Sequence, residues 1–484
     1  MTAEGGDGGA PFDDVDPWSV SSPPPDLPPL FSEPEAKSGL RIVDPNEAPP
    51  EPRLQLNKQG NPRKNLANVI DMLSRHDDWR GAIAYDAFRQ CIVKVRPPPV
   101  RKEDASDSVR AGEWTDADTI RTCAWLSSRP LQFHRLDVDG GLVDKAIIAV
   151  AEQRVVHPVR DWFESLRWDG KVRLDGLFPK YFRAHDTQFT REAGKRWMIS
   201  AVARIYRPGC QVKYMPVLES PQDFGKSTGL QALFGSGSDG ASWYSDTGLT
   251  IGNKDSYQCL RAKLGYEWSD LSTMRSARDV ESLKVFISST VDNYRPSYGH
   301  RNRDFPRQCV FVGTTNEDRW LTDPTGGSRF WPVRCYPLHI LRDEIAADRD
   351  MLWAEAVARF QSNERWWIDG ATEAPLLTTA RSEQSARREI DPWQGTLETW
   401  LARPTVPDGA GGRSVVDVTQ GFAGHEALLG ALEMRKGDMT RAHETRLGYV
   451  LRELGFDRRR VRTENGGRAY LYFPADAPRT DDAE

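Results

Sequence analysis

The sequence predicts an α/β chain, with a mostly helical part before its core and a small helix-and-strand part after it. Three observations carry this prediction. An apolar run at 214–218 leads into a tight loop and then a helical stretch that opens with Gly225-Lys226-Ser227-Thr228. A second apolar run, at 308–313, ends in Thr314-Thr315-Asn316. Near the end of the chain, a helical pattern precedes two strands joined by an Asn-Gly turn.

Length and composition set the outer bounds. A chain of 484 residues predicts two or three domains. The net charge of −5 does not by itself indicate a nucleic-acid partner, so any basic surface must be local. The six cysteines are scattered without a C-x-x-C pair, which is typical of reduced thiols in a cytosolic protein. Without a signal peptide or a long apolar span, we expect a soluble, cytoplasmic protein with no membrane partner.

The amino-terminal third divides into a tail and a folded part. Residues 1–60 are rich in Pro, Gly, Asp and Glu, which predicts a disordered tail. Residues 61–195 are expected to form a mostly helical domain that also contains a β-hairpin. Helical patterns begin near residues 66, 120 and 143, and the hairpin is placed around residues 82–95.

One acidic pair in this domain has two interpretations. Asp137 and Asp139 are spaced like the paired metal-binding aspartates of a polymerase or primase. Short D-x-D matches are common, however, and a Gly-Gly pair follows this one. The alternative is a turn that caps the next helix.

The segment 196–370 is predicted to be a P-loop NTPase domain. The stretch from Ser220 to Thr228 follows the phosphate-binding pattern G-x-x-x-x-G-K-[ST], with Ser220 in the place of its first glycine. Loop N–H groups, from Ser220 to Gly225, and the helix N-terminus that follows would hold phosphate oxygens. Lys226 would reach the terminal phosphates and Ser227 would hold Mg²⁺, so ATP and Mg²⁺ are the expected cofactors.

A hydrolase needs a carboxylate and a polar group near the terminal phosphate. A short strand ending in acids, around residues 264–271, offers Glu267 as the first candidate for activating water and Asp270 as a second that assists the metal. Asn316 follows a buried strand, where it could sense the γ-phosphate. The alternatives are an acidic strand end at a surface turn and an asparagine that only caps a turn.

Arginines are the remaining groups that a nucleotide hydrolase of this kind needs. Arg329 lies on a Gly-rich loop before an apolar strand and could neutralise charge on the transferring phosphoryl group, in its own subunit or a neighbour's. A basic, aromatic loop before the strand at 308–313 carries Arg295, Arg301, Arg303 and Arg307. Any of Arg295, Arg307 or Arg329 could contact the nucleotide, and the others could bind nucleic-acid phosphates. A solvated basic loop paired with local carboxylates is the alternative.

Further short motifs stand in order between these elements: Trp168-Asp169-Gly170, Arg173-Leu174, Pro208-Gly209, Leu283-Lys284, Asp292-Asn293-Tyr294-Arg295-Pro296-Ser297-Tyr298-Gly299 and Asp323-Pro324-Thr325-Gly326-Gly327-Ser328-Arg329-Phe330-Trp331-Pro332-Val333. The ordered set, over roughly residues 60–370, resembles the virulence-associated protein E family of phage, plasmid and genomic-island ATPases.

The resemblance implies a fold related to superfamily 3 and AAA+ helicases. It also implies an ATP-dependent, ring-forming DNA helicase or replication initiator of a mobile element, with a possible primase partner. The chain departs from the family pattern at Ser220 and Asp223 in the loop and at Ser328, where many members carry a second arginine. Ser220 is compatible with the loop if its φ is negative.

The carboxyl-terminal part, 391–474, is predicted to be a winged-helix DNA-binding domain. Thr440 caps a helix from Arg441 to Leu454, and the basic strand 456–462 pairs with 468–473 across the Asn-Gly turn. Between residues 435 and 468, ten Arg or Lys face five Asp or Glu. The same fold could instead contact protein. Three strand arginines are the candidate phosphate contacts: Arg459, Arg460 and Arg462.

Together these features predict a DNA-dependent ATPase of helicase type that acts on single-stranded or forked DNA as a homo-oligomeric ring. The alternative is a nucleotide-gated DNA-binding or interference protein of a mobile element that hydrolyses little ATP. The altered loop residues Ser220 and Asp223 favour that alternative, whereas Glu267 and Asn316 oppose it. A primase is a third hypothesis, and it depends on Asp137 and Asp139 alone.

Overall fold

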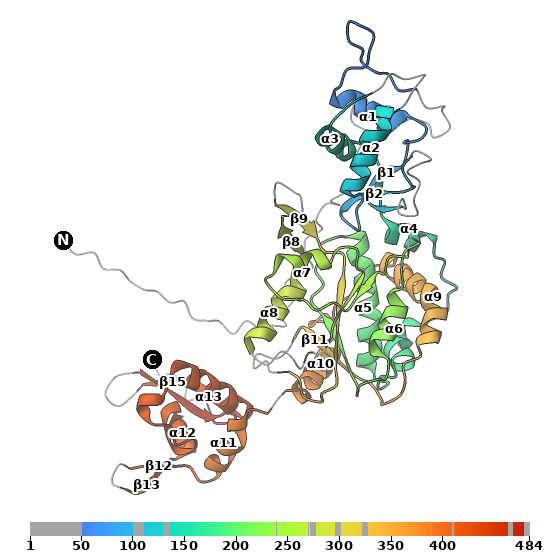
Figure 1. Cartoon of the computed structure of the whole chain (residues 1–484). Helices are drawn as coiled ribbons and strands as arrows, with labels where there is room; N and C mark the ends of the chain where they lie inside the picture. The colour runs from blue at the N-terminus through green and yellow to red at the C-terminus, as the bar shows by residue number, and fades with distance from the viewer. Residues whose placement is uncertain are drawn as a thin grey trace, which may run out of the picture. The chain divides into compact units, whose positions relative to one another are not determined.

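The computed structural model describes residues 51–99, 111–128, 136–238, 240–269, 271, 277–295, 302–321, 328–388, 390–408, 411–462 and 468–478. Most of the tail predicted at 1–60 therefore lies outside the described residues. The chain divides into two compact units, the first ending at Arg387 and the second beginning at Arg388 (Figure 1).

A small sheet and four helices form the amino-terminal part of the first unit. Strands β1 and β2 pair antiparallel, which confirms the predicted hairpin, and they form the centre of a four-stranded sheet in the order β3-β2-β1-β4. The outer strands have only two residues each, too few for a sequence pattern to reveal. The elements are α1 Leu66–Arg75, β1 Ile83–Asp86, β2 Cys91–Lys94, β3 Gly112–Glu113, α2 Asp116–Ser128, α3 Gly140–Ala151, β4 Val155–Val156 and α4 Pro158–Ser165.

The acidic pair in this part is structural. The Asp139 side chain accepts a hydrogen bond from the Leu142 N–H at 3.0 Å and is the N-cap of α3. Asp137 pairs with the Lys64 ammonium at 3.1 Å. The described residues contain no group of three or more His, Cys, Asp or Glu that could hold a metal ion. The capping alternative is therefore confirmed for Asp139.

A five-stranded parallel sheet forms the centre of the first unit, in the order β11-β5-β10-β7-β6. The domain boundary expected between residues 195 and 196 falls inside helix α5. The elements are α5 Gln188–Tyr206, β5 Met215–Glu219, α6 Lys226–Phe234, β6 Tyr244–Ser245, α7 Lys254–Cys259, β7 Gly265–Trp268, α8 Ala277–Ser288, β8 Val291–Tyr294, β9 Arg303–Pro306, β10 Val310–Thr315, β11 Phe330–Arg334, α9 Arg342–Gln361 and α10 Ala374–Ala386.

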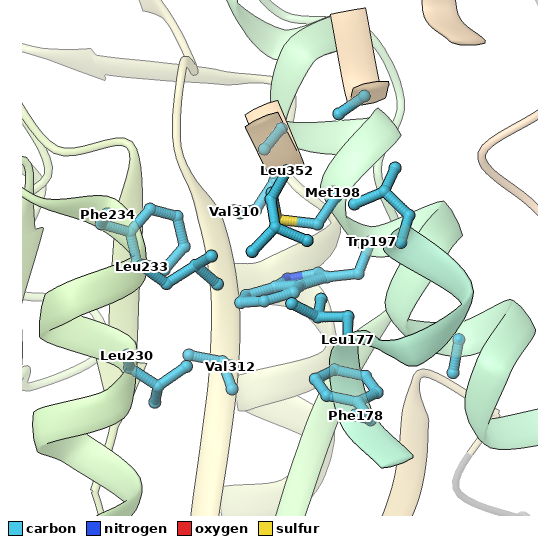
Figure 2. Packing of buried hydrophobic residues seen from close by; sticks show 14 of the residues in the cluster. Leu177, Phe178, Trp197, Met198, Leu230, Leu233, Phe234, Val310, Val312 and Leu352 are labelled. Carbon is cyan, nitrogen blue, oxygen red and sulfur yellow. The ribbon is translucent and has the colours of Figure 1, made fainter. Parts of the chain in front are cut away.

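Both faces of this sheet are covered by apolar side chains, as parallel sheets require. Successive residues of β10 alternate between the two faces: Val310 and Val312 pack with α5, α6 and α9, and Phe311 packs with α8. Figure 2 shows Trp197 of α5 beside Val312 and the side chains of α6. Its indole N–H donates to the Phe311 carbonyl at 2.9 Å, so burial of this tryptophan leaves its own donor paired.

The second unit packs three helices against a three-stranded sheet in the order β14-β16-β15. Helix α13 is capped by Thr440 and buries Leu447, Val450 and Leu451, as its sequence pattern predicts. The Asn-Gly turn predicted between the last two strands lies outside the described residues. The elements are α11 Pro392–Ala402, β12 Thr405–Pro407, β13 Arg413–Val415, β14 Phe422–Ala423, α12 Gly424–Gly430, α13 Arg441–Glu453, β15 Phe456–Arg462 and β16 Arg468–Pro474.

A membrane-spanning helix would need a long apolar segment, and none of the helices in the described ranges provides one.

Candidate functional site

The loop between β5 and α6, residues 220–225, bends sharply into the helix. Gly225 is the N-cap of α6 with φ 84°, and Asp223 also has a positive φ of 66°. A short polar aspartate tolerates the left-handed region better than most side chains do. Ser220 is not among the described residues with positive φ, so the serine fits where a glycine was expected. The N-terminal N–H groups of α6 are left without helix partners at this turn.

Lys226, the first residue of α6, folds its side chain back over the loop. Its ammonium donates to the carbonyl of Ser220 at 2.7 Å, to that of Pro221 at 3.0 Å and to Asn316 Oδ1 at 3.3 Å. Burial lowers the pKa of the Lys226 ammonium, and the nearby carboxylates Glu267 and Asp223 oppose that shift. The lysine is therefore a desolvated cation held by neutral oxygens, placed where an anion would bind strongly.

Glu267 lies on β7 with its side chain fully inside the protein. Its Oε1 accepts hydrogen bonds from Ser227 and Thr314, each at 2.8 Å, and its Oε2 accepts one from the Tyr244 hydroxyl. Burial is the main cause that raises the pKa of the Tyr244 phenol, and the charge of Glu267 adds to it. The phenol therefore stays protonated and donates its hydrogen bond. The Ser269 hydroxyl adds a longer hydrogen bond to Oε1 at 3.4 Å, so four hydroxyl groups hold one carboxylate beside the first turn of α6.

Strand order explains why these groups meet. β10, which ends at Thr315, lies between β5 and β7, and all three strands run parallel. Their carboxyl ends therefore bring the β5–α6 loop, Asn316 and Glu267 to one edge of the sheet. Here an open cavity of about 800 Å³ is lined by Gln222, Asp223, Phe224, Gly225, Lys226, Ser227, Thr228, Glu267, Ser269, Thr314, Thr315, Asn316 and His339.

The residues fit a hydrated Mg²⁺ ion with a polyphosphate. The Ser227 hydroxyl and the Glu267 carboxylate, 2.8 Å apart, are the hard oxygen donors that Mg²⁺ accepts. Since Mg²⁺ keeps several waters and takes its remaining ligands from substrate phosphates, one or two protein oxygens are enough. Asp270, the second candidate, lies outside the described residues.

A buried ion pair supports the strand that leads into the loop. Glu219, the last residue of β5, accepts hydrogen bonds from Arg387 at 2.9 Å and from the Trp320 indole at 2.8 Å. All three side chains are buried. No sequence pattern predicts this pair, because Arg387 lies 168 residues from Glu219 and neither belongs to a motif.

Tyr244 was missed for a similar reason. It belongs to β6, a strand of two residues at the edge of the sheet, and no motif marks it. Its aromatic character predicts burial, but only the pairing of β6 with β7 places its hydroxyl at Glu267.

Arg329 lies at the opposite edge of the sheet. It immediately precedes β11, and its carbonyl accepts a hydrogen bond from the Met215 N–H at 2.8 Å, where β5 begins. The five residues of β5 then separate it from the β5–α6 loop by roughly 16 Å. An arginine side chain cannot cover that length, so Arg329 is not brought together with Lys226, Glu267 and Asn316 of its own chain.

The strands that flank the basic loop form the β8–β9 hairpin, which precedes β10 at the amino edge. Arg295 and Arg303 are exposed there, whereas Arg301 is outside the described residues. Arg307 is only 2 % exposed, and its guanidinium contacts Asp292 at 2.6 Å and 2.8 Å. The nucleotide contact considered for Arg307 is therefore wrong: this side chain closes the base of the hairpin.

The strand arginines of the second unit divide between two faces of β15. Arg460 and Arg462 are exposed on the same face as Arg458, opposite Tyr470 and Arg468 of β16. Arg459 points the other way and donates to the carbonyls of Pro474, Ala477 and Pro478. An exposed arginine row thus exists, and Arg458, which the sequence analysis omitted, belongs to it while Arg459 does not.

Residues 163–389 match the family model described as the virulence-associated protein E-like domain. No curated protein matches the chain. Among solved structures, two of the NrS-1 C-terminal region in its A form without ligand are similar, at 13 % and 14 % identity. Each alignment covers 64 % of this chain and 77 % of the other, with a TM-score of 0.32.

Proposed function

We propose, from the premise that this chain belongs to the virulence-associated protein E-like family through residues 163–389, that it is a DNA-dependent ATPase of a mobile genetic element. The single observation that carries the proposal is the convergence of Lys226, Glu267 and Asn316 on one cavity, from three neighbouring parallel strands and the helix α6. In this proposal the core is a P-loop NTPase related to superfamily 3 and AAA+ helicases, and the protein takes part in replication of the element.

Each side chain then has a task in hydrolysis. The Lys226 ammonium and the N–H groups of the β5–α6 loop bind the phosphates, which replace the carbonyl partners of the lysine. Ser227 and the bound phosphates hold Mg²⁺, which neutralises charge on the phosphate oxygens. Glu267 orients and polarises the attacking water, and Asn316 binds the γ-phosphate. Thr228, whose hydroxyl donates to the Gly225 carbonyl at 2.9 Å, stabilises the turn.

The loop carboxylate favours a second candidate function, a nucleotide-gated DNA-binding protein with little hydrolysis. Asp223 lines the cavity and would place a negative charge near the phosphates. Its positive φ puts it at the bend of the loop, where its side chain is exposed to water. Because water strongly screens an exposed charge, Asp223 should repel the phosphates only weakly. We therefore propose hydrolysis as the first function and gated binding as the second.

Turnover of ATP separates the two functions. We expect wild-type protein to hydrolyse ATP faster with single-stranded DNA, Lys226→Ala to lose nucleotide binding, and Glu267→Gln to bind ATP while turnover falls by about 10²-fold or more. Lys213→Ala, which changes a lysine just before β5, is the matched control. Wild-type turnover no faster than that of Lys226→Ala, with ATP still bound, would establish the gated binding protein instead.

For the second unit we propose a winged-helix domain that binds DNA through the exposed face of β15. Two neighbouring arginines provide a matched pair for the test. Arg460 is exposed, whereas Arg459 donates hydrogen bonds to backbone carbonyls such as that of Ala477. Arg460→Ala should weaken DNA binding and lower the salt slope by about 0.7–0.9, and Arg459→Ala should do neither. Equal effects from both variants would contradict this assignment.

A further inference from the structure

Two aromatic side chains are among those that line the cavity. Phe224, in the β5–α6 loop, and His339, between β11 and α9, both line the cavity. Their ring centroids are 5.4 Å apart with planes inclined at 52°. His339 is exposed and Phe224 half-buried, so each ring offers a face to a ligand.

The backbone holds the two rings together. The Ile340 N–H donates to the Phe224 carbonyl at 3.0 Å, which fixes the residue after His339 to the loop. The His339 carbonyl in turn accepts a hydrogen bond from Arg183 Nε at 3.4 Å. Ile340 also lies so close to α6 that a Cβ on Gly229 would meet its Cγ2 at 2.6 Å. The pair is therefore part of the packed site and not a chance contact of loops.

The order of the strands indicates in which direction a bound nucleotide extends from the phosphate site. In the order β11-β5-β10-β7, the strands that carry Asn316 and Glu267 lie on one side of β5, and β11 lies on the other. A terminal phosphate held by Lys226 at Asn316 therefore directs the rest of the nucleotide away from β10. The segment after β11, which contains His339, is the part of the cavity wall on that side.

We infer that Phe224 and His339 form the base subsite, where the purine ring of the nucleoside triphosphate stacks on their exposed faces. This inference rests on the proposed function and adds the residues that bind the base of the nucleotide. A two-ring base offers a large π-face to such a platform, and stacking on an aromatic side chain contributes to affinity without hydrogen-bond readout. The phosphates and the base are then bound by separate groups of residues.

Two ligands, ATP and inorganic tripolyphosphate, test the subsite because only ATP carries a base. We expect His339→Ala to raise the Kd for ATP by roughly tenfold and to leave the Kd for tripolyphosphate unchanged. His339→Phe, which keeps a stacking face, should retain wild-type ATP affinity. Tyr336→Ala is the control: this exposed tyrosine stacks on His185 at 4.3 Å and does not line the cavity.

The outcomes are distinct. If His339→Ala binds both ligands as wild type does, or loses both equally, the base subsite is wrong even though phosphate binding at Lys226 stands. If wild-type protein binds neither ligand, the proposed function fails and the subsite fails with it. Loss of ATP affinity alone, restored by phenylalanine, supports the subsite.

Discussion

The two edges of the central sheet carry different kinds of chemistry. At the carboxyl edge, Lys226 contacts Asn316, Glu267 contacts Ser227 beside the lysine, and all of these residues line one cavity. At the amino edge, Arg329 precedes β11, and the β8–β9 hairpin presents the exposed side chains of Arg295 and Arg303. The two edges therefore differ in arrangement: the carboxyl edge gathers its polar groups around one cavity, whereas the amino edge presents exposed arginines on a hairpin.

The largest effect is expected from Arg329. In a homo-oligomeric ring, which the sequence predicts, Arg329 of one copy would reach the cavity of the next, since it cannot reach its own. Arg329→Ala should then lower turnover by about 10³-fold or more and leave ATP binding intact. Mixing Arg329→Ala chains with Lys226→Ala chains should restore some turnover, because a mixed interface pairs an intact arginine with an intact cavity. Mixtures as inactive as the separate variants would rule out action between subunits.

Breaking the buried pair beneath the carboxyl edge should cost stability. Arg387→Met leaves Glu219 buried without its partner and is expected to destabilise the fold by about 3–5 kcal/mol. Arg191→Met, which removes the exposed ion pair with Asp186, should cost less than about 1 kcal/mol. Urea unfolding followed by tryptophan fluorescence measures both. Similar values for the two variants would show that Glu219 is not held in a dry environment.

Removing one donor from Glu267 should change the rate more than the binding. Tyr244→Phe keeps the ring packing and deletes the hydroxyl, so we expect kcat to fall about tenfold with the KM for ATP within twofold. Steady-state kinetics of both proteins measure the two values. A kcat as high as that of the wild type would reduce Tyr244 to a packing residue.

Lys226 predicts an alkaline loss of nucleotide affinity. Burial lowers the pKa of its ammonium from the ordinary 10.5, and only the charged form attracts phosphates. As pH rises, the lysine should therefore lose its proton, and ATP affinity should decline, at a lower pH than for an exposed lysine. Titration of ATP binding across the alkaline range, by a fluorescent analogue, checks the direction. Constant affinity up to the ordinary lysine pKa would contradict it.

The smallest effect is expected on DNA binding, in a comparison of one arginine from the amino edge with one from the carboxyl edge. Arg303 starts β9 at the amino edge, and Arg334 ends β11 at the carboxyl edge, where it pairs with Asp318. If the hairpin binds DNA, Arg303→Ala should weaken single-stranded DNA binding a few-fold and reduce its salt slope by about 0.7. Arg334→Ala should leave both values unchanged. Binding isotherms at several salt concentrations provide the comparison.

Local patterns were enough to predict most elements of the carboxyl edge. The apolar run before Ser220 is β5, Lys226 opens α6, and the strand before Asn316 is β10. Each of these features is encoded within about ten neighbouring residues, by strand propensity, by a glycine at positive φ or by a helix start. The shortest strands were not predicted, because β6 and β4 have only two residues each. The expected domain boundary was also misplaced, since it falls inside the helix α5.

The sequence by itself determined the chemistry of the chain: a loop with Lys226 and Ser227, an acidic strand with Glu267, and a strand that ends in Asn316. Only the tertiary structure decided which groups meet. Strand order put β10 between β5 and β7, placed Tyr244 on Glu267 and joined Arg387 to Glu219. Strand order also placed Arg329 at the amino edge of the sheet, opposite the cavity. The physical reason is that a strand's residue types follow from local sequence, whereas its neighbours in a sheet depend on packing across the whole core.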